Sequence, residues 1–141
     1  MMSGKTFKML EDIVITITSI RNANPNDYDE IWAIVRSFKN KPYYIRQVPE
    51  LSPSWDLFKK YLSLRDMGMW NKESFERYYR PYFVSQINAD PWAQSVLETL
   101  IAKHNSGKKI ALVCFCTDVN LCHRRIISEM LTERGVENTL S

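Results

Sequence analysis

The chain has 141 residues, of which 45% are hydrophobic and 25% are charged, as in ordinary globular domains with a hydrophobic core. The net charge of +3 permits an anionic partner such as nucleic acid but does not require one. No stretch approaches the roughly 18 apolar residues that span a membrane, and the first residues lack the apolar core of a secretory signal. The three cysteines are an odd number, so we interpret them as reduced thiols of a cytoplasmic protein.

The first part of the chain predicts two strands separated by a helix. We separate residues 1–12, as an N-terminal extension, from a single domain over residues 13–141. Residues 13–19 are rich in β-branched side chains, which favour a strand. Apolar residues at helical spacing then predict a helix from Pro25 to about Phe38. Residues 43–45 predict a short second strand.

The central part predicts a run of helices. Ser52 is suited to cap a helix that begins at Pro53 and stops near Gly68. A second helix begins around Asn71, and Pro81 should kink or end it because proline lacks the backbone donor. The pair Asp90-Pro91 predicts the start of a third helix.

The last part predicts a strand, a loop, a helix and an edge strand. Residues 110–115 form a continuous apolar run, which is typical of a strand buried on both faces. A polar loop leads to a helix that opens at Cys122 and ends at Gly135, and residues 136–140 predict the edge strand. This order favours one three-layer α/β/α domain with a mostly parallel sheet of about four to five strands. The helical insert over residues 52–86 should pack over one end of the sheet.

Reactive side chains gather at the start of the last helix. The thiolate of Cys122 would be stabilised there by the helix dipole and by neighbouring cations, which suits a nucleophile or a redox thiol. Alternatively, Cys122 is a small buried residue. His123 should point toward the sheet, either as a general acid/base or as a structural side chain bound to a loop carbonyl.

The arginines predict an anion site. Arg124 and Arg125 lie in the first helical turn, where the dipole disfavours cations, so they suggest a visiting anion. Arg21 and Arg46 each follow a predicted strand and would converge on the same place. Two loop residues complete the predicted ligand-binding set, Cys116 and Asp118. The alternative is that these arginines pair with carboxylates such as Asp118 or Glu129.

Spacing argues against two other sites. A phosphatase-type loop has five residues between the catalytic cysteine and an arginine, and no cysteine here has an arginine at that sixth position. Zinc would need Cys114, Cys116, Cys122 and His123 to converge. Cys114 and Cys116 on an extended strand would lie about 7 Å apart at the backbone, and the usual Cys-x2–4-Cys knuckle is missing. We therefore expect no metal and no other cofactor.

Aromatic residues are concentrated in the middle of the chain, where residues 43–92 hold 12 of the 17. At helical spacing such residues are usually core, although some can stack on nucleobases. The three whose exposure would decide this are Trp55, Trp70 and Tyr79.

The segment ALVCFCTDVNLCHRRIISEML, residues 111–131, resembles the signature of the domain of unknown function 488 family. In that signature an apolar strand ends in cysteine, and a loop leads to Cys-His-Arg at a helix start. Leu51-Ser52-Pro53-Ser54, the stretch Glu73 to Tyr79 and the strand ITITSIRN resemble further parts of the family, from about residue 13 to 137. The resemblance implies a compact three-layer α/β fold and a small bacterial, archaeal or phage protein. One common form of the signature has an acid soon after the first cysteine, which Cys114-Phe115-Cys116 lacks.

Three functions are consistent with these features. The first is a protein, either an enzyme or a binding protein, that recognises the phosphate of a nucleotide or nucleic acid at the Cys-His-Arg helix. The second is a non-catalytic module that binds a protein partner and in which this segment is structural. The third is thiol redox chemistry between Cys116 and Cys122. The sequence does not distinguish oligomeric states.

Overall fold

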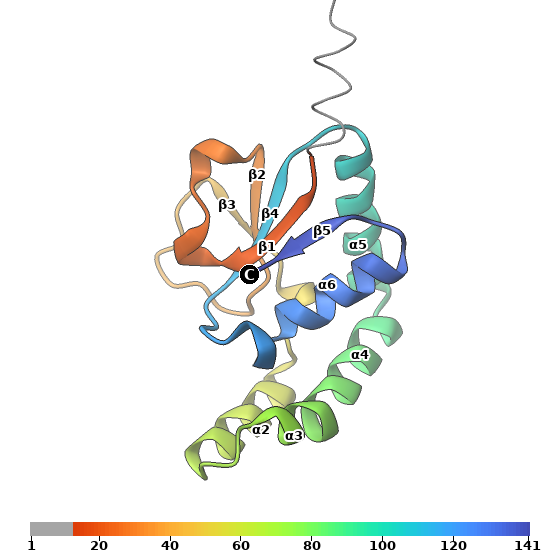
Figure 1. Cartoon of the computed structure of the whole chain (residues 1–141). Coiled ribbons are helices and arrows are strands. Elements are labelled where there is room, and N and C mark those ends of the chain that lie inside the picture. Colours follow the sequence, from red (N-terminus) through yellow and green to blue (C-terminus); the bar gives the residue numbers. More distant parts are fainter. Residues whose placement is uncertain (1–12) are drawn as a thin grey trace, which may run out of the picture.

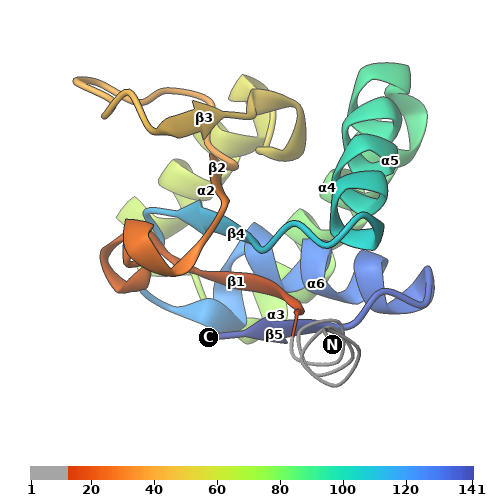
Figure 2. The same cartoon turned by 90° about the horizontal axis from the view of Figure 1, so that it is seen from above.

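Five parallel strands form the centre of the molecule, in the spatial order β3-β2-β4-β1-β5 (Figures 1 and 2). The computed structural model describes residues 13–141, so the predicted extension over residues 1–12 lies outside the described residues. The strands are β1 (Ile15–Ser19), β2 (Glu30–Ala33), β3 (Ile45–Gln47), β4 (Ile110–Cys114) and β5 (Asn138–Leu140). The α/β class and the parallel sheet are confirmed.

The helices lie between and beyond these strands. Four short 3-10 turns are η1 (Ile20–Asn22), η2 (Pro25–Asp27), η3 (Pro49–Leu51) and η5 (Val119–Leu121). The longer helical segments are α2 (Trp55–Asp66), α3 (Lys72–Ser74), the π-helical η4 (Phe75–Tyr79), α4 (Arg80–Ala89), α5 (Pro91–Asn105) and α6 (His123–Glu133). None of the helices described in residues 13–141 combines the length and apolarity needed to cross a bilayer.

The central strand β4 is buried at every position, as its continuous apolar run predicts. It pairs with β1 on one side and with β2 on the other. In these registers Ser19 lies opposite Cys114, and Ala33 lies opposite Val113. The carboxyl ends of β1, β2 and β4 are therefore level. The predicted edge strand is confirmed as β5, which pairs with β1.

The helix predicted from Pro25 to Phe38 is wrong. Pro25 begins only the short turn η2, which the side chain of Asn24 caps, and the chain then enters β2. Residues 31–35 are all buried, and β2 pairs with both β3 and β4. A strand covered on both faces is apolar throughout, so some of its residues also fall at helical spacing. Because the helix prediction includes residues 30–33, β2 is not identified from the sequence as the strand that pairs with β3.

Strand β3 begins at Ile45, two residues later than predicted. Tyr43 and Tyr44 are exposed and belong to the preceding turn, which the hydrogen bond from the Ile45 amide to the Pro42 carbonyl closes. A hydrogen bond from the fourth residue back to the first, as between Ile45 and Pro42, defines a four-residue turn. The two central residues of this turn, Tyr43 and Tyr44, are exposed to solvent and do not pack against the sheet.

The helical insert lies beyond the carboxyl-terminal edge of the sheet, as predicted. Figure 1 shows α2 and α3 below the sheet, on the side toward which the strands run. Ser54, and not Ser52, caps α2 by accepting from the Leu57 amide, so Pro53 precedes the cap. Asp90 and Pro91 open α5 as expected.

Pro81 does not end the helical run, but it lies in the first turn of α4, directly after the helix changes from π to α geometry. The five residues before Arg80 adopt a π-helical turn, and α4 continues through Pro81. A π-turn accommodates a residue that cannot donate the regular hydrogen bond, and such turns are frequent at functional sites. Here it turns Tyr79 inward, since Tyr79 is buried and Tyr78 is exposed.

Candidate functional site

A pocket of about 360 Å³ lies at the carboxyl ends of β2 and β4. After β2 the chain continues to β3 on one side of the sheet, and after β4 it continues through α6 to β5 on the other side. The two connections diverge, and such switch points are where ligands bind in open α/β sheets. Residues 35–37 and 114–118 line the pocket directly after these two strands.

One wall of the pocket is aromatic. The side chains that form it come from the helical insert: Trp55, Phe58, Tyr61, Trp70 and Tyr79. They touch in series, with ring centroids 6.2 Å apart from Trp55 to Phe58, 4.8 Å from Tyr61 to Trp70 and 5.4 Å from Trp70 to Tyr79. Trp55 is 53% exposed and Tyr79 only 5%. The wall therefore runs from solvent at Trp55 to the interior at Tyr79.

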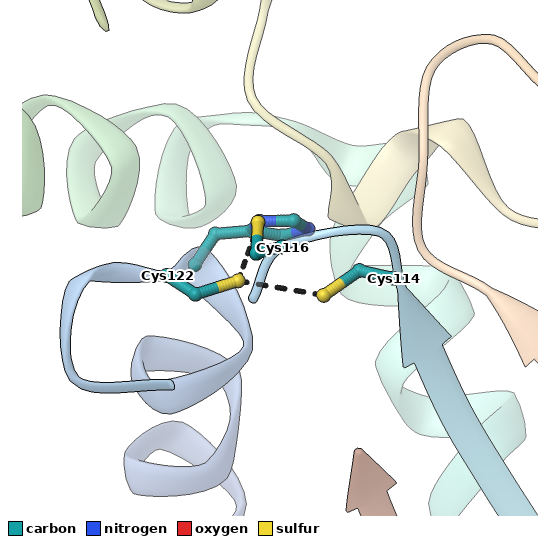
Figure 3. A group of neighbouring side chains, drawn as sticks. Cys114, Cys116 and Cys122 are labelled. Atoms are coloured by element: carbon teal, nitrogen blue, oxygen red, sulfur yellow. Dashed lines mark hydrogen bonds between the residues drawn. The ribbon is translucent and has the colours of Figure 1, made fainter. Parts of the chain in front are cut away.

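Another part of the pocket lining carries three cysteines and a histidine. Figure 3 shows the side chains of Cys114, Cys116 and Cys122 gathered between the end of β4, the following loop and the start of α6. The three sulfur atoms and a ring nitrogen of His123 all lie within 4.8 Å of one another. The Cys114 and Cys122 sulfurs are 3.4 Å apart, and Nδ1 of His123 is 3.6 Å from the Cys122 sulfur.

The expectation that these four side chains do not converge is wrong. The spacing argument placed Cys116 on an extended strand, but β4 ends at Cys114 and the chain turns there. The turn brings the Cys116 sulfur back to the others. Cys122 and His123 converge because Cys122 is extended, as the residue that caps the helix, while His123 is helical. This group of four is therefore a geometrically plausible metal-ligand set, which spacing alone had excluded.

His123 is held in one orientation. Its Nε2 lies 2.8 Å from the carbonyl oxygen of Ile34 in β2's extension. A carbonyl oxygen only accepts hydrogen bonds, so Nε2 carries a proton and donates it. Nδ1 then faces the sulfurs, and the ring edge packs on Phe83 with centroids 5.7 Å apart. This placement of His123 is consistent with both interpretations, the structural side chain bound to a carbonyl and the general acid/base.

Arg124 lies behind the cluster and not in the pocket. It is buried, with an exposed fraction of 2%. Its Nη1 donates to the Cys116 carbonyl at 2.8 Å and to the Cys114 sulfur at 3.4 Å, and its Nε donates to the backbone oxygen of Ser141. The anionic group that this guanidinium faces is therefore a cysteine sulfur of the chain itself.

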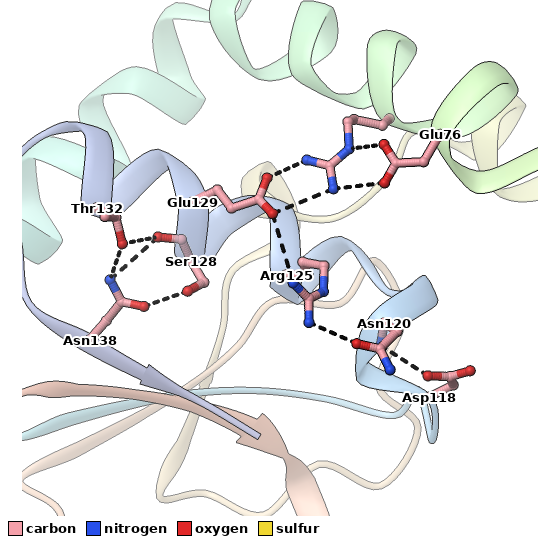
Figure 4. Close-up of polar contacts among 9 residues, drawn as sticks. Glu76, Asp118, Asn120, Arg125, Ser128, Glu129, Thr132 and Asn138 are labelled. Atoms are coloured by element: carbon pink, nitrogen blue, oxygen red, sulfur yellow. Dashed lines mark hydrogen bonds and ion pairs between the residues drawn. The ribbon is translucent and has the colours of Figure 1, made fainter. Parts of the chain in front are cut away.

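Arg125 points the other way, along the outside of α6 (Figure 4). It donates to the side-chain oxygen of Asn120 at 2.7 Å and pairs with Glu129 at 4.0 Å. Glu129 also binds Arg80, which in turn binds Glu76. For Arg125, then, the structure shows the carboxylate pairing that the sequence left as the alternative.

Arg21 and Arg46 also lie away from the pocket. They follow β1 and β3, which β4 and β2 separate in the sheet. Three strand spacings amount to about 14 Å. Arg46 lies over the ring of Trp32 at 4.5 Å, and Arg21 is exposed in η1. The structure does not bring the four predicted arginines together.

The arginine that does line the pocket is Arg36, which the sequence analysis missed. Its Nε donates to the Pro53 carbonyl at 2.8 Å and its Nη2 to the Pro49 carbonyl at 3.1 Å. Arg36 follows β2 closely, as Arg21 follows β1. The erroneous helix over residues 25–38 concealed that signal. Asp118, by contrast, lines the pocket, and its carboxylate accepts from the Asn120 amide; its role in ligand binding stays a prediction.

The pKa values of the three thiols shift in different directions. Hydrogen bonds from Cys116 and Cys122, together with the nearby His123 and Arg124, lower the pKa of the Cys114 thiol despite its burial. The hydrogen bond to Cys114 raises the pKa of Cys116. Burial, with the same hydrogen bond, raises the pKa of Cys122 to about 12. The contacts of Cys114 therefore favour its thiolate form, whereas burial favours the neutral thiol at Cys122.

The neighbours respond to this negative charge. Burial opposes protonation of His123, but its contacts with Cys116 and Cys114 outweigh burial and raise its pKa. Burial raises the pKa of Tyr79 well above its ordinary value, so that phenol stays neutral in the pocket wall.

A family model described as the active DUF488-N3 subclade matches residues 17–135. The chain therefore belongs to the DUF488 family, as the Cys-His-Arg segment predicts. The match includes the whole pocket, from the end of β2 to the start of α6. No curated protein and no solved structure matches the chain.

Proposed function

We propose that this member of the DUF488 family binds the base of a nucleotide or of single-stranded nucleic acid and acts on it with the thiol–imidazole cluster. The observation that carries the proposal is that one pocket is lined both by an aromatic wall and by three thiols and an imidazole. Its volume of about 360 Å³ lies at the small end of the range for ligand pockets. That size suits a single planar ring system.

Stacking would supply most of the affinity. Trp55 and Phe58 keep part of their rings in solvent at the pocket mouth, although ordinary packing would bury them. A base stacked on an aromatic side chain gains about 1–3 kcal/mol, whichever base it is. Deeper in the pocket the ligand would meet Tyr79 and then the cluster.

Polar groups beside the aromatic wall would hold the phosphate. Arg36 lies in the pocket wall, and the exposed hydroxyl side chains Ser37 and Thr117 line the same pocket. This modifies the anion site expected from the sequence, because Arg36 takes the place of the other arginines. In this proposal the start of α6 does not bind the phosphate. Its Arg124 instead donates a hydrogen bond to the sulfur of Cys114.

Calorimetric titration of the protein with the four common nucleoside monophosphates, and with their nucleosides, at low salt tests the proposal. We expect Trp55→Ala to weaken binding about 5- to 100-fold, as lost stacking predicts. The matched control is Trp92→Ala, since Trp92 is 75% exposed and lies outside the pocket. Nucleotides should bind more tightly than nucleosides, and added salt should reduce the difference.

Two results would overturn the proposal. One is that the folded wild-type protein binds none of these ligands or a short single-stranded oligonucleotide. The other is that Trp55→Ala and Trp92→Ala weaken binding equally, because the ligand would then lie elsewhere. With the second result, the same titration would still measure how tightly the ligand binds to a surface outside the pocket.

A second function, thiol redox chemistry, is supported by the 3.4 Å between the Cys114 and Cys122 sulfurs. Formation of their disulfide would release two protons and two electrons to a disulfide substrate. The sequence predicts the Cys116–Cys122 pair instead, and those two sulfurs also lie within 4.8 Å of each other. Thiol titration before and after treatment with oxidised glutathione tests it: two thiols should disappear together, and Cys114→Ser should abolish the loss.

A further inference from the structure

We propose that Cys114, Cys116, Cys122 and His123 form a binding site for a zinc ion at the base of the pocket. The inference goes beyond the proposed function and does not depend on it, since metal binding is measured without any nucleotide. It rests on four features of the cluster: its size, the orientation of His123, the charge of Arg124 and the exposure of Cys116.

The ligand atoms already have the spacing of a tetrahedral site. Zinc lies about 2.3 Å from thiolate sulfur and about 2.0 Å from imidazole nitrogen, so the ligand atoms of such a site are about 3.5–3.8 Å apart. The Cys114–Cys122 distance is 3.4 Å, and the Cys122–His123 distance is 3.6 Å. All four atoms lie within 4.8 Å of one another. Side-chain adjustments of up to about 1 Å would place them around one ion.

His123 has the orientation of a metal ligand. The hydrogen bond from Nε2 to the Ile34 carbonyl fixes the proton on the far side of the ring. The lone pair of Nδ1 is thereby directed at the sulfurs. A second hydrogen bond of this kind, to a carbonyl or a carboxylate, accompanies nearly all metal-binding histidines because it fixes the tautomer.

Arg124 indicates that the cluster is negatively charged. Its guanidinium is buried, and its partners are the Cys116 carbonyl, a main-chain oxygen of Ser141 and the Cys114 sulfur, with no aspartate or glutamate among them. A buried cation beside neutral thiols would be poorly compensated. Three thiolates around a zinc dication carry a net charge of −1, which the guanidinium balances.

The cluster is open on one side. Cys114, Cys122 and His123 are buried, whereas Cys116 is partly exposed and lines the pocket. An ion held by the three buried ligands would therefore have Cys116 between it and the pocket. We infer that Cys116 is the ligand a substrate or water can displace, which is the arrangement of three protein ligands and one exchangeable position found at catalytic zinc sites.

Metal analysis of the reduced full-length protein tests the site. We expect about one zinc per chain after purification without chelators, or after anaerobic addition of zinc to stripped protein. Cobalt(II) should give a thiolate charge-transfer absorption. Cys116→Ser should weaken zinc binding at least about tenfold, and His123→Ala should do so as well.

The chain supplies its own control, because its only other histidine is His104. His104→Ala should keep full zinc binding, and so should Trp55→Ala, which separates this site from the proposed base-binding function. Cys116 is the least buried ligand, so its replacement leaves the fold intact and the result interpretable. The proposal fails if reduced, folded protein takes up no zinc or cobalt. It also fails if Cys116→Ser and His123→Ala bind zinc as tightly as His104→Ala does.

Discussion

The two consecutive arginines at the start of α6 have opposite environments. Arg124 is 2% exposed and faces a cysteine sulfur and two backbone oxygens. Arg125 has a side chain that is 34% exposed, and it belongs to the surface network of Figure 4 with Asn120 and Glu129. On the inner face of α6, the charge of Arg124 therefore contacts the cysteine cluster. On the outer face, the charge of Arg125 links the helix to Asn120 and Glu129 at the surface.

This contrast also decides how each side chain can be replaced. A surface ion pair is solvated whether or not its partner is present, so its loss costs little. A buried donor leaves its acceptors without water when it is removed. The experiments below compare the inner face with the outer face, from the largest expected effect to the smallest.

Arg124→Met should lower the free energy of unfolding by about 3 kcal/mol, because it leaves the Cys116 and Ser141 oxygens without their donor. Arg125→Met removes the same group one residue later and should cost less than about 1 kcal/mol. Urea unfolding of both variants measures the difference. Equal losses would show that the two faces of α6 do not differ as the contacts indicate.

His123→Ala should cost about 2 kcal/mol, since it removes the donor to the Ile34 carbonyl and leaves a space beside Phe83. His123→Gln should cost clearly less, because an amide NH₂ can replace the Nε2 donor. Thermal unfolding in the presence of a chelator isolates this packing effect from metal binding. If both variants lose the same stability, the hydrogen bond to Ile34 contributes nothing.

Glu30 at the opposite end of the sheet provides a reference far from the cluster. Burial raises the pKa of its carboxyl group, but hydrogen bonds from Trp32 and Lys103 outweigh burial, so the folded-state pKa lies below the ordinary value. Its contribution is therefore fully present above the unfolded-state pKa of about 4.3 and is lost as the pH falls through the folded-state value.

Glu30→Gln should accordingly cost less than about 1 kcal/mol at pH 7. The difference from wild type should shrink as the pH falls below about 4. Chemical unfolding at pH 7 and pH 3 measures this. A difference that grows toward low pH would reverse the sign and contradict the assigned contacts.

Several parts of the fold were predictable because they depend on local features. The buried strand β4, the Asp90-Pro91 start of α5 and the helix that opens after Cys122 each follow from a short run of apolar residues or a capping residue. Residues 31–35 show the limit of this approach. Their apolar run suits a helix or a fully buried strand equally, and only pairing with β3 and β4 selects the strand.

The site was predictable in its position but not in its composition. The sequence placed reactive residues at the carboxyl end of β4, and the pocket lies there. It did not reveal that Arg36 and the aromatic wall share that pocket, since they come from segments 19 or more residues apart that only the sheet order and the helical insert bring together.

The sequence by itself determined the family, the α/β class and the Cys-His-Arg helix start, because each is written in contiguous residues. The tertiary structure decided which side chains meet. It turned the chain after Cys114, so that Cys116 returned to the other sulfurs, and it faced Arg124 inward and Arg125 outward. Spacing along a chain does not define distance where the backbone turns, and charge alone does not tell a buried cation from a solvated one.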